Sequence, residues 1–381
     1  MVIKMDTIYL DHAATTAMEP EAVEAMLPYF RQFYGNPSAA YRMATESKKV
    51  LRKTRQMMAG TLQILPEEVF FTSGGTESDN WAVLGTARHF GKGHIITSRI
   101  EHPAVLETCR YLEHNGFEVT YLDVSREGIV DLEQLSRSFR RDTILVSVMY
   151  ANNEVGTIQP IRQIAEMARQ HGVLFHTDGV QAYGQIPVSG EDGFDMFSAS
   201  AHKFGGPKGV GFLVIRKSCQ AQTWLYGGGQ EKGLRSGTEN VPGIAGMGKA
   251  AELAEKNLCE RMEKVTAMRE KLIQGMCEKI PGVVCNGSRE NRLPGNVHFS
   301  FPGNVEAEAL LIWLDQHGVQ ASGGSACSNV KRHASHVLTA MGLADSQIRS
   351  SIRMTLGADN TPQEMDRVMN LCEEFYRSGR K

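Results

Sequence analysis

One lysine is flanked by the residue types that a Schiff-base site uses. Lys203 lies in the stretch SASAHKFGGPKG, residues 198–209, between two short apolar runs that predict strands. A lysine amine attacks a carbonyl only in a desolvated setting that lowers its pKa. The glycines let the backbone turn tightly beside a bound ring. A surface lysine in a Gly-Pro turn would give the same pattern, so the other segments must decide.

Polar residues follow several predicted strands at the point where each strand ends. His102, Asn153 and Asp178 each come shortly after a short apolar run. Strands alternate with helices from residue 68 onward, which predicts a parallel sheet, and ligands bind at the carboxyl ends of such strands. Asp178 can pair with a protonated ring nitrogen, and Gln181 can lie on the same face of the turn. Each residue alone can be structural, but their convergence with Lys203 favours a site.

A glycine-rich turn between a predicted strand and a helix suggests an anion site. The segment SGGTESDN, residues 73–80, contains Gly75 and Thr76. Such turns bind phosphate through backbone N–H groups and the positive end of the helix dipole. The turn is neither a Walker loop nor a dinucleotide fingerprint, which argues against a dehydrogenase and for a smaller phosphorylated group. A plain helix cap is the alternative.

One of the seven cysteines has neighbours that stabilise a thiolate. Cys327 lies in a Gly/Ser-rich segment and is followed by Lys331, Arg332 and His333. The odd number of cysteines and the lack of a Cys-x-x-Cys pair argue against a disulfide framework and a structural zinc site. Cys327 is therefore a candidate reactive thiol, with a small buried residue as the alternative.

An arginine late in the chain lies in an alternating strand pattern. Arg353 shares the polar face of residues 351–356 with Ser351 and Thr355. A guanidinium in that place can hold a carboxylate through two hydrogen bonds. A surface ion pair is the alternative for this arginine.

The composition limits the class of protein. The chain has 381 residues, 41% of them hydrophobic, and a net charge of −2, so no strongly basic surface for nucleic acid is expected. No apolar run is long enough to span a bilayer, and the N-terminal residues lack a signal peptide's apolar region. We expect a cytoplasmic protein with no membrane contact and no direct nucleic-acid partner.

The length suits two domains joined by a long helix. Apolar residues recur at helical spacing from Gly243 to about Ile280, which predicts one helix that bridges the domains. The preceding part reads as α/β, and the following part reads as a smaller α+β domain.

Taken together, these segments resemble the cysteine desulfurases of the NifS/IscS type, which are pyridoxal-phosphate enzymes of the class V aminotransferase family. The resemblance runs from Tyr9 to the last predicted helix, and the ordered motifs are SGGTESDN, EHPAV, ANNEVGTIQP, HTDGVQA, SASAHKFGGPKG, RSGTEN, GSACS and SIRMTLG. It implies fold type I of the pyridoxal-phosphate-dependent transferases. The large domain, with a mainly parallel sheet between helices, would span 15–255. The small α+β domain would comprise 1–14 and 256–381.

The resemblance also implies roles for the residues at the strand ends. Lys203 would hold the cofactor covalently and move protons, and Asp178 would pair with the pyridinium nitrogen. Gln181 would bond the phenolic oxygen, while His102 would stack on the ring and take part in proton transfer. Cys327 would attack the substrate sulfur as a thiolate.

Other positions would surround the phosphate and the substrate. Asn153 would lie beside the cofactor and, with Arg353, hold the substrate carboxylate. Thr238 would reach the phosphate from a second subunit, which implies a homodimer. The phosphate-binding residues of the chain would be Thr76, Ser200 and His202, and Gly75 would be a further cofactor-binding residue.

The implied reaction converts L-cysteine to L-alanine and leaves a persulfide on Cys327. The sulfur would then pass to an acceptor protein, such as an iron–sulfur scaffold or a tRNA-thiolation protein. No resident metal is expected, although Cys327 could ligate a cluster transiently in a complex. Tyr41 stands where many relatives have histidine, and it is given no role. The basic residues 331–333 also depart from many relatives; they would favour the thiolate or an acidic partner.

Three alternatives stay open. A selenocysteine lyase could use the same residues, because one site can bind both amino acids. Another class V enzyme, such as an aminotransferase, would not need Cys327. A sulfur-relay scaffold without its own catalysis would not need Lys203, Asp178 and His102 together.

Overall fold

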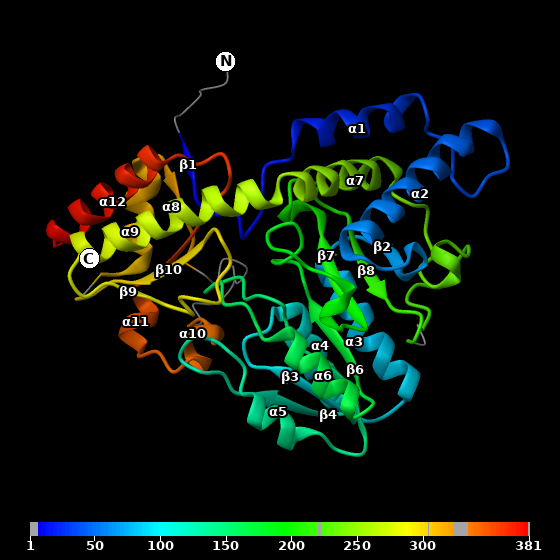
Figure 1. Cartoon of the computed structure of the whole chain (residues 1–381), viewed down its shortest axis with the longest axis horizontal. Helices are drawn as coiled ribbons and strands as arrows, with labels where there is room; N and C mark the ends of the chain where they lie inside the picture. The colour runs from blue at the N-terminus through cyan, green and yellow to red at the C-terminus, as the bar shows by residue number, and fades with distance from the viewer. Residues whose placement is uncertain (1–6, 220–221, 304, 324–333, 380–381) are drawn as a thin grey trace.

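The strands and helices that alternate after residue 68 form a seven-stranded sheet in the computed structural model (Figure 1). The structure describes residues 7–219, 222–303, 305–323 and 334–379. β8 runs antiparallel to both of its neighbours, whereas the other strand pairs are parallel. This confirms the predicted α/β fold with a mainly parallel sheet. The strand order is β2 (Val69–Thr72), β8 (Gly211–Ile215), β7 (Met196–Ser200), β6 (Leu174–Asp178), β5 (Thr143–Ser147), β3 (His94–Ser98) and β4 (Glu118–Leu122).

Helices cover both faces of this sheet. The helices of this half are α1 (Pro20–Arg31), α2 (Arg42–Leu62), α3 (Gly75–Phe90), α4 (Pro103–His114), α5 (Leu132–Ser138), α6 (Ile161–Gln170) and α7 (Val241–Lys256). Adjacent strand residues enter different cores because side chains alternate across a strand. Phe70 packs with residues of α3 and α4, whereas Phe71 packs with residues of α2, α6 and α7.

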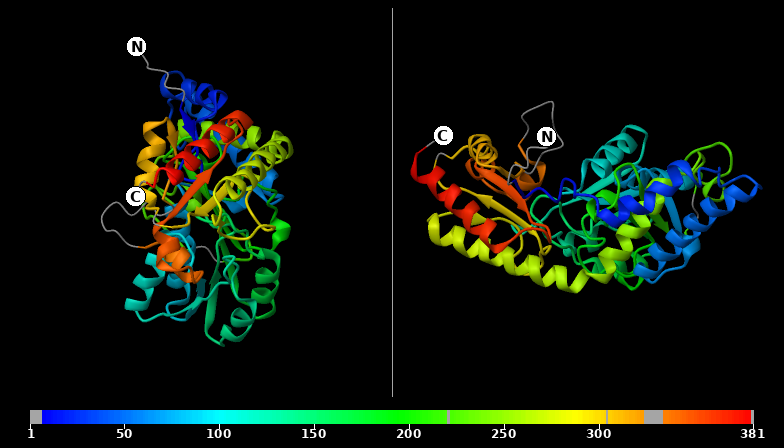
Figure 2. Two further views of the ribbon diagram at one scale, coloured as in Figure 1. Left: turned by 90° about the vertical axis from the view of Figure 1, so that its left-hand side faces the viewer. Right: turned by 90° about the horizontal axis from the view of Figure 1, so that it is seen from above.

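The second half of the molecule is built on a three-stranded antiparallel sheet. Its elements are α8 (Leu258–Lys279), β9 (Val284–Cys285), β10 (Asn296–Ser300), α9 (Ala307–Gln316), α10 (His336–Ala340), α11 (Asp345–Arg349), β12 (Ser351–Thr355) and α12 (Pro362–Arg377). The first strand, β1 (Ile8–Tyr9), joins this half by pairing with β11 (Val319–Gln320). Figure 2 shows the two halves side by side along the long axis of the molecule.

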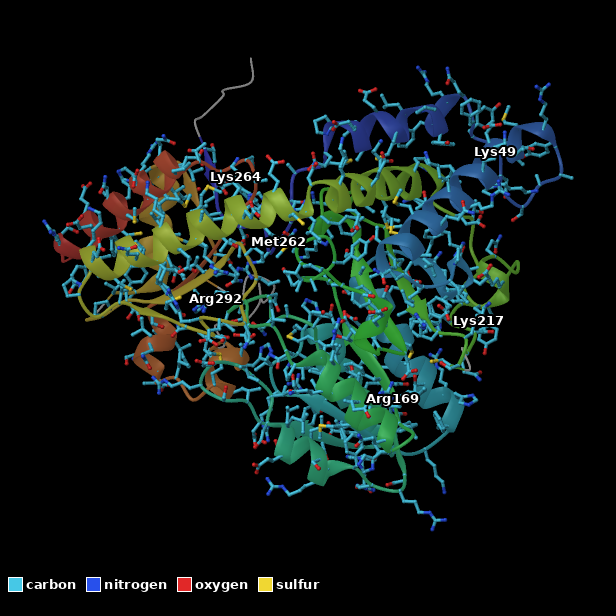
Figure 3. All side chains as sticks on the ribbon, viewed as in Figure 1. Lys49, Arg169, Lys217, Met262, Lys264 and Arg292 are labelled. Carbon is cyan, nitrogen blue, oxygen red and sulfur yellow. The ribbon has the colours of Figure 1, made fainter. Side chains whose placement is uncertain are left out.

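The predicted bridging helix is two helices, so that expectation is wrong in detail. Asn257, with φ −102° and ψ 8°, separates α7 from α8. Met262 packs against the core of the first half, and Val265 lies in the core of the second. Met262 and Lys264 mark this junction on α8 (Figure 3). The break lets the apolar stripes of α7 and α8 face different cores. The domain boundary near residue 255 stays a prediction.

The described residues contain neither a membrane-spanning helix nor a cluster of metal-ligating side chains. None of the helices there is long and apolar enough to cross a membrane. No group of three or more His, Cys, Asp or Glu side chains in the same residues could hold a metal ion.

Candidate functional site

The predicted site residues come together at one edge of the large sheet. β3, β5, β6 and β7 are mutually parallel neighbours, so their carboxyl ends lie at the same edge. Asp178 is the last residue of β6 and Ser200 the last of β7. His102 is the N-cap of α4, which follows β3. The short 3₁₀ turn after β7 ends at Lys203.

A cavity of about 380 Å³ lies where α3 begins. Its lining comes from the β2–α3 turn, the β7–β8 connection and the N-terminal segment, and comprises Ala14, Thr15, Ser73, Gly74, Gly75, Thr76, Glu77, Ser200, His202, Lys208 and Gly209. The sixteen-residue α3 directs its positive dipole end here, and no side chain caps it at Gly74. The geometry therefore suits an anion, and we call this cavity the anion cradle.

Two titratable side chains of the anion cradle determine the charge that a ligand meets there. Its carboxylate, Glu77, is neutralised by Arg235, whose Nε lies 2.8 Å from Oε1. Burial acts to raise the pKa of Glu77, but hydrogen bonds from Arg235 and Ser73 hold it below its ordinary value. His202 shares a hydrogen bond of 3.1 Å between its Nδ1 and Thr15 Oγ1. Burial, reinforced by Lys203 and Lys208, lowers the pKa of His202 to about 4, so it is a neutral donor or acceptor.

Lys203 and Gln181 meet at the same carbonyl oxygen. Lys203 Nζ donates to Ala13 O at 2.6 Å and to Ala14 O at 2.8 Å. Gln181 Nε2 donates to Ala13 O at 3.0 Å. Gln185 Nε2 donates to the Lys203 carbonyl at 2.9 Å and fixes the turn. The N-terminal segment therefore orients the lysine, which the sequence pattern did not indicate.

Asp178 and His102 form an electrostatically linked pair. Asp178 is buried, and Oδ1 accepts a 2.9 Å hydrogen bond from Val180 N. Burial raises its pKa, while His102 and Lys203 nearby act in the opposite direction. Burial lowers the pKa of His102. Its Nδ1 accepts from Ala104 N at 3.1 Å, so a neutral His102 carries its proton on Nε2.

The two residues predicted to hold a substrate carboxylate are in contact. Arg353 Nη1 donates to Asn153 O at 3.0 Å, and Arg353 Nη2 lies 2.6 Å from Asp11 Oδ1. Arg353 is only 2% exposed, because all of β12 is buried; the surface ion pair considered from the sequence is wrong. Its Nε is buried without a hydrogen-bond partner among the described residues. This guanidinium therefore has one N–H donor that no described residue satisfies.

One predicted site residue, Thr238, is not brought to this edge within the single chain. Thr238 is exposed and does not line the anion cradle. Arg235, three residues earlier, contacts the lining of the anion cradle by pairing with Glu77. Cys327 and residues 331–333 lie outside the described residues, so their roles stay predictions.

The sequence reasoning missed several charged groups. Asp11 pairs with Arg353 across 342 residues, and no local pattern links them. Glu101 is fully buried, and its carboxylate accepts from Ser98 Oγ at 2.5 Å and from Met149 N at 2.9 Å. Burial raises the pKa of Glu101 to about 8. In the sequence, the only indication of this buried carboxyl group was a charged residue directly before His102.

Known proteins resemble this chain over nearly its whole length. The family model described as aminotransferase class-V matches residues 8–368. A cysteine desulfurase IscS of Clostridium botulinum is 45% identical over 379 residues, which cover 98% of this chain and 95% of that protein. A solved NifS-like protein superimposes with a TM-score of 0.92 at 40% identity and covers 98% of this chain and 100% of its own. A structure described as SspA in complex with cysteine gives 0.83 at 34% identity, over 93% and 100% of the two chains.

The architecture is that of a NifS-like α/β enzyme. The chain belongs to the class V aminotransferase family, because both the family model and the relatives cover nearly all of it. The resemblance stated from the sequence motifs is thereby confirmed.

Proposed function

We propose that the chain is a cysteine desulfurase that uses pyridoxal phosphate to convert L-cysteine to L-alanine and passes the sulfur to Cys327. The observation that carries the proposal is the convergence of Lys203, Asp178 and His102 beside the anion cradle. The 45% identity to a cysteine desulfurase over nearly the whole chain, and a structural relative described with cysteine, support the substrate.

The residues present fit pyridoxal phosphate. The anion cradle suits its phosphate, and the buried Asp178 carboxylate suits a protonated ring nitrogen. Lys203 suits the covalent attachment of its aldehyde carbon, and Gln181 its phenolic oxygen. When bound, this group withdraws electrons from the bonds around the substrate's α-carbon.

The chain's own residues would bind the substrate and move its protons. Arg353 and Asn153 would orient the carboxylate of L-cysteine. Lys203 would hold and return the α-proton, because its amine lies beside Asp178 and His102. A neutral His102 with its proton on Nε2 would donate that proton or stack, rather than act as a cation.

The sulfur step rests on Cys327, since the transfer needs a thiolate nucleophile. A thiol with a pKa of ~8.5 is only a few per cent ionised at neutral pH, and the basic residues 331–333 would favour the ionised form. The persulfide would pass to an acceptor protein, such as an iron–sulfur scaffold or a tRNA-thiolation protein. A cytoplasmic location also belongs to this proposal.

A homodimer is part of the proposed assembly. Thr238 is exposed in the single chain, and so are Leu225 and Tyr226 on the segment that pairs with Arg235. Tyr226 is 86% exposed and adjoins the exposed Leu225, so the two form apolar surface that a partner could cover. A second subunit that covers this surface would bring Thr238 to an anion cradle.

The direct test of the activity is the stoichiometry of the products. The purified chain with pyridoxal phosphate, L-cysteine and a thiol reductant should release alanine and sulfide in equal amounts. Production of pyruvate instead would indicate a lyase, and production of another keto acid would indicate a transaminase. Either result would contradict the proposal. L-selenocysteine as the second substrate distinguishes the selenocysteine lyase alternative.

Gly75→Ala is expected to weaken the binding of pyridoxal phosphate by roughly tenfold or more. A Cβ at Gly75 would lie 2.7 Å from Val180 Cγ2, and overpacking of this kind costs ~1–3 kcal/mol. The strain falls between the anion cradle and the turn after Asp178. The dissociation constant is measured by absorbance titration. Gly60→Ala is the control and should bind normally, because a Cβ there would meet no atom within 4 Å beyond the local backbone of its own helix.

A further inference from the structure

A row of buried polar side chains crosses the large sheet behind Asp178. Thr97, Ser147, His176 and Ser198 point toward α3 and α4, because their strand neighbours Ile96, Val146, Phe175 and Phe197 pack on the opposite face. All four are 0% exposed. Nothing in the proposed reaction uses them.

Hydrogen bonds join the centre of this row. His176 Nδ1 lies 2.8 Å from Ser147 Oγ, and His176 Nε2 lies 3.0 Å from Ser198 Oγ. Both ring nitrogens therefore already have hydroxyl partners. Burial lowers the pKa of His176 to about 3, so the imidazole is neutral.

Asp79 of α3 faces this row from above. It is 1% exposed, and its Oδ1 lies 3.6 Å from His176 Nε2, beyond hydrogen-bond distance. That oxygen has no hydrogen-bond partner among the described residues. Among the described residues, His176 is also the only basic side chain with a nitrogen within 4.0 Å of the Asp79 carboxyl group.

The environment of Asp79 disfavours a negative charge. A buried carboxylate needs a cation or several N–H donors. Burial, together with the charges of Asp178 and Glu101, raises its pKa well above the ordinary value; only the Ser198 hydroxyl acts in the opposite direction. From α4, Cys109 faces the same region with its pKa raised by burial to about 12. β2, β5, β7 and β8 contribute no titratable residue.

Asp79 also connects two parts of the cofactor site. It lies one turn after Thr76 on the helix that begins at the anion cradle. Ser198 is the ladder partner of Asp178, and its carbonyl accepts from Gly179 N at 3.0 Å. A contact between Asp79 and Ser198 therefore fixes the phosphate-binding helix relative to the Asp178 turn.

We propose that Asp79 is a positioning residue that the folded protein keeps as a neutral carboxylic acid. The acid donates its proton in a hydrogen bond to the Ser198–His176 row, so that α3 presents no second negative charge to Asp178. This proposal rests on the proposed cofactor site, but not on the fate of the sulfur. An ionised Asp79 would repel the Asp178 carboxylate and weaken its pairing with a ring nitrogen.

The first test compares the unfolding of the native chain with that of Asp79→Asn as a function of pH. Asparagine copies the shape and the neutrality of the acid. An acid that stays protonated in the folded state but ionises on unfolding stabilises the fold below pH ~4, and that stabilisation is lost as the pH rises toward its folded pKa. As the pH rises through this range, the unfolding constant of the native chain should therefore increase relative to that of Asp79→Asn, by up to about tenfold per pH unit.

The control is the same substitution at another buried acid. Asp192 is 5% exposed, but it pairs with Arg162 at 2.9 Å and accepts from Ser189 N and Tyr150 Oη. Asp192→Asn should destabilise the protein at neutral pH because it removes a charged partner. If Asp79→Asn behaved like Asp192→Asn, or did not fold, Asp79 would be an ionised partner of His176 and the proposal would be wrong.

The second test measures positioning in the cofactor-bound protein without substrate. Asp79→Ala should weaken pyridoxal phosphate binding and move the pH midpoint of the absorbance of the bound cofactor, whereas Asp79→Asn should restore both to native values. Loss of stability in Asp79→Ala with an unchanged midpoint would contradict positioning. The products formed with L-cysteine test the desulfurase proposal independently, so a failure of that proposal can be told apart from a failure of this one.

Discussion

Lys203→Ala is expected to abolish alanine formation from L-cysteine, with a loss of at least ~10⁴-fold in rate. The variant removes both the group that would attach the cofactor and the group that would move the α-proton, and a positioned acid–base group alone contributes ~10²–10⁴-fold. The amine lies 2.6 Å from Ala13 O, at the meeting point of the site. The rate is measured with the cofactor present in excess.

A lysine far from the site provides the matched control. Lys217 carries an exposed amine, 3.9 Å from the exposed carboxylate of Glu67, and Figure 3 shows it on the first half of the molecule. Lys217→Ala should keep native activity, because an exposed pair contributes little. Substantial turnover by Lys203→Ala would mean that another residue carries the proton, and the assignment of Lys203 would fail.

Arg353→Ala is expected to lower kcat/KM for L-cysteine by about 10- to 100-fold, mainly through a higher KM. The guanidinium has a buried Nε without a described partner, and hydrogen bonds to charged groups contribute ~1.5–3 kcal/mol. Loss of the carboxylate contact would act on substrate binding more than on the chemical step. Steady-state kinetics with L-cysteine measures both constants.

Asp11→Asn separates this role from a structural one. Arg353 pairs with Asp11 at 2.6 Å, so its removal also leaves that carboxylate without its cation. Asp11→Asn keeps the guanidinium and should retain most of the affinity for L-cysteine. If Asp11→Asn reproduced the full loss in kcat/KM, the arginine would serve the N-terminal segment and not the substrate.

Local sequence patterns predicted most of the fold and the core of the site. Asp178 and Ser200 could be predicted because each ends a strand, and parallel strand ends meet at one edge. The glycine-rich turn before α3 was recognisable because its spacing is short and its chemistry is local. The ordered motifs of the family gave the roles that no single segment could give.

Contacts between distant segments could not be predicted. The Asp11–Arg353 pair and the Ala13 carbonyl that accepts from Lys203 and Gln181 depend on how the N-terminal segment crosses the site. Asp79 has the sequence pattern of an ordinary helix residue, because its burial depends on the sheet beneath it. The apolar spacing across Asn257 was continuous, so it could not indicate that two different cores receive the two helices.

The most direct measurement of the central claim is the fate of sulfur after one turnover. The protein with pyridoxal phosphate is mixed with L-cysteine in the absence of a reductant, and its peptides are analysed by mass spectrometry. The account predicts one added sulfur atom on Cys327 for each alanine formed, and neither product in Cys327→Ala, which should still bind the cofactor. Alanine and sulfide formation at the native rate by Cys327→Ala would contradict the account.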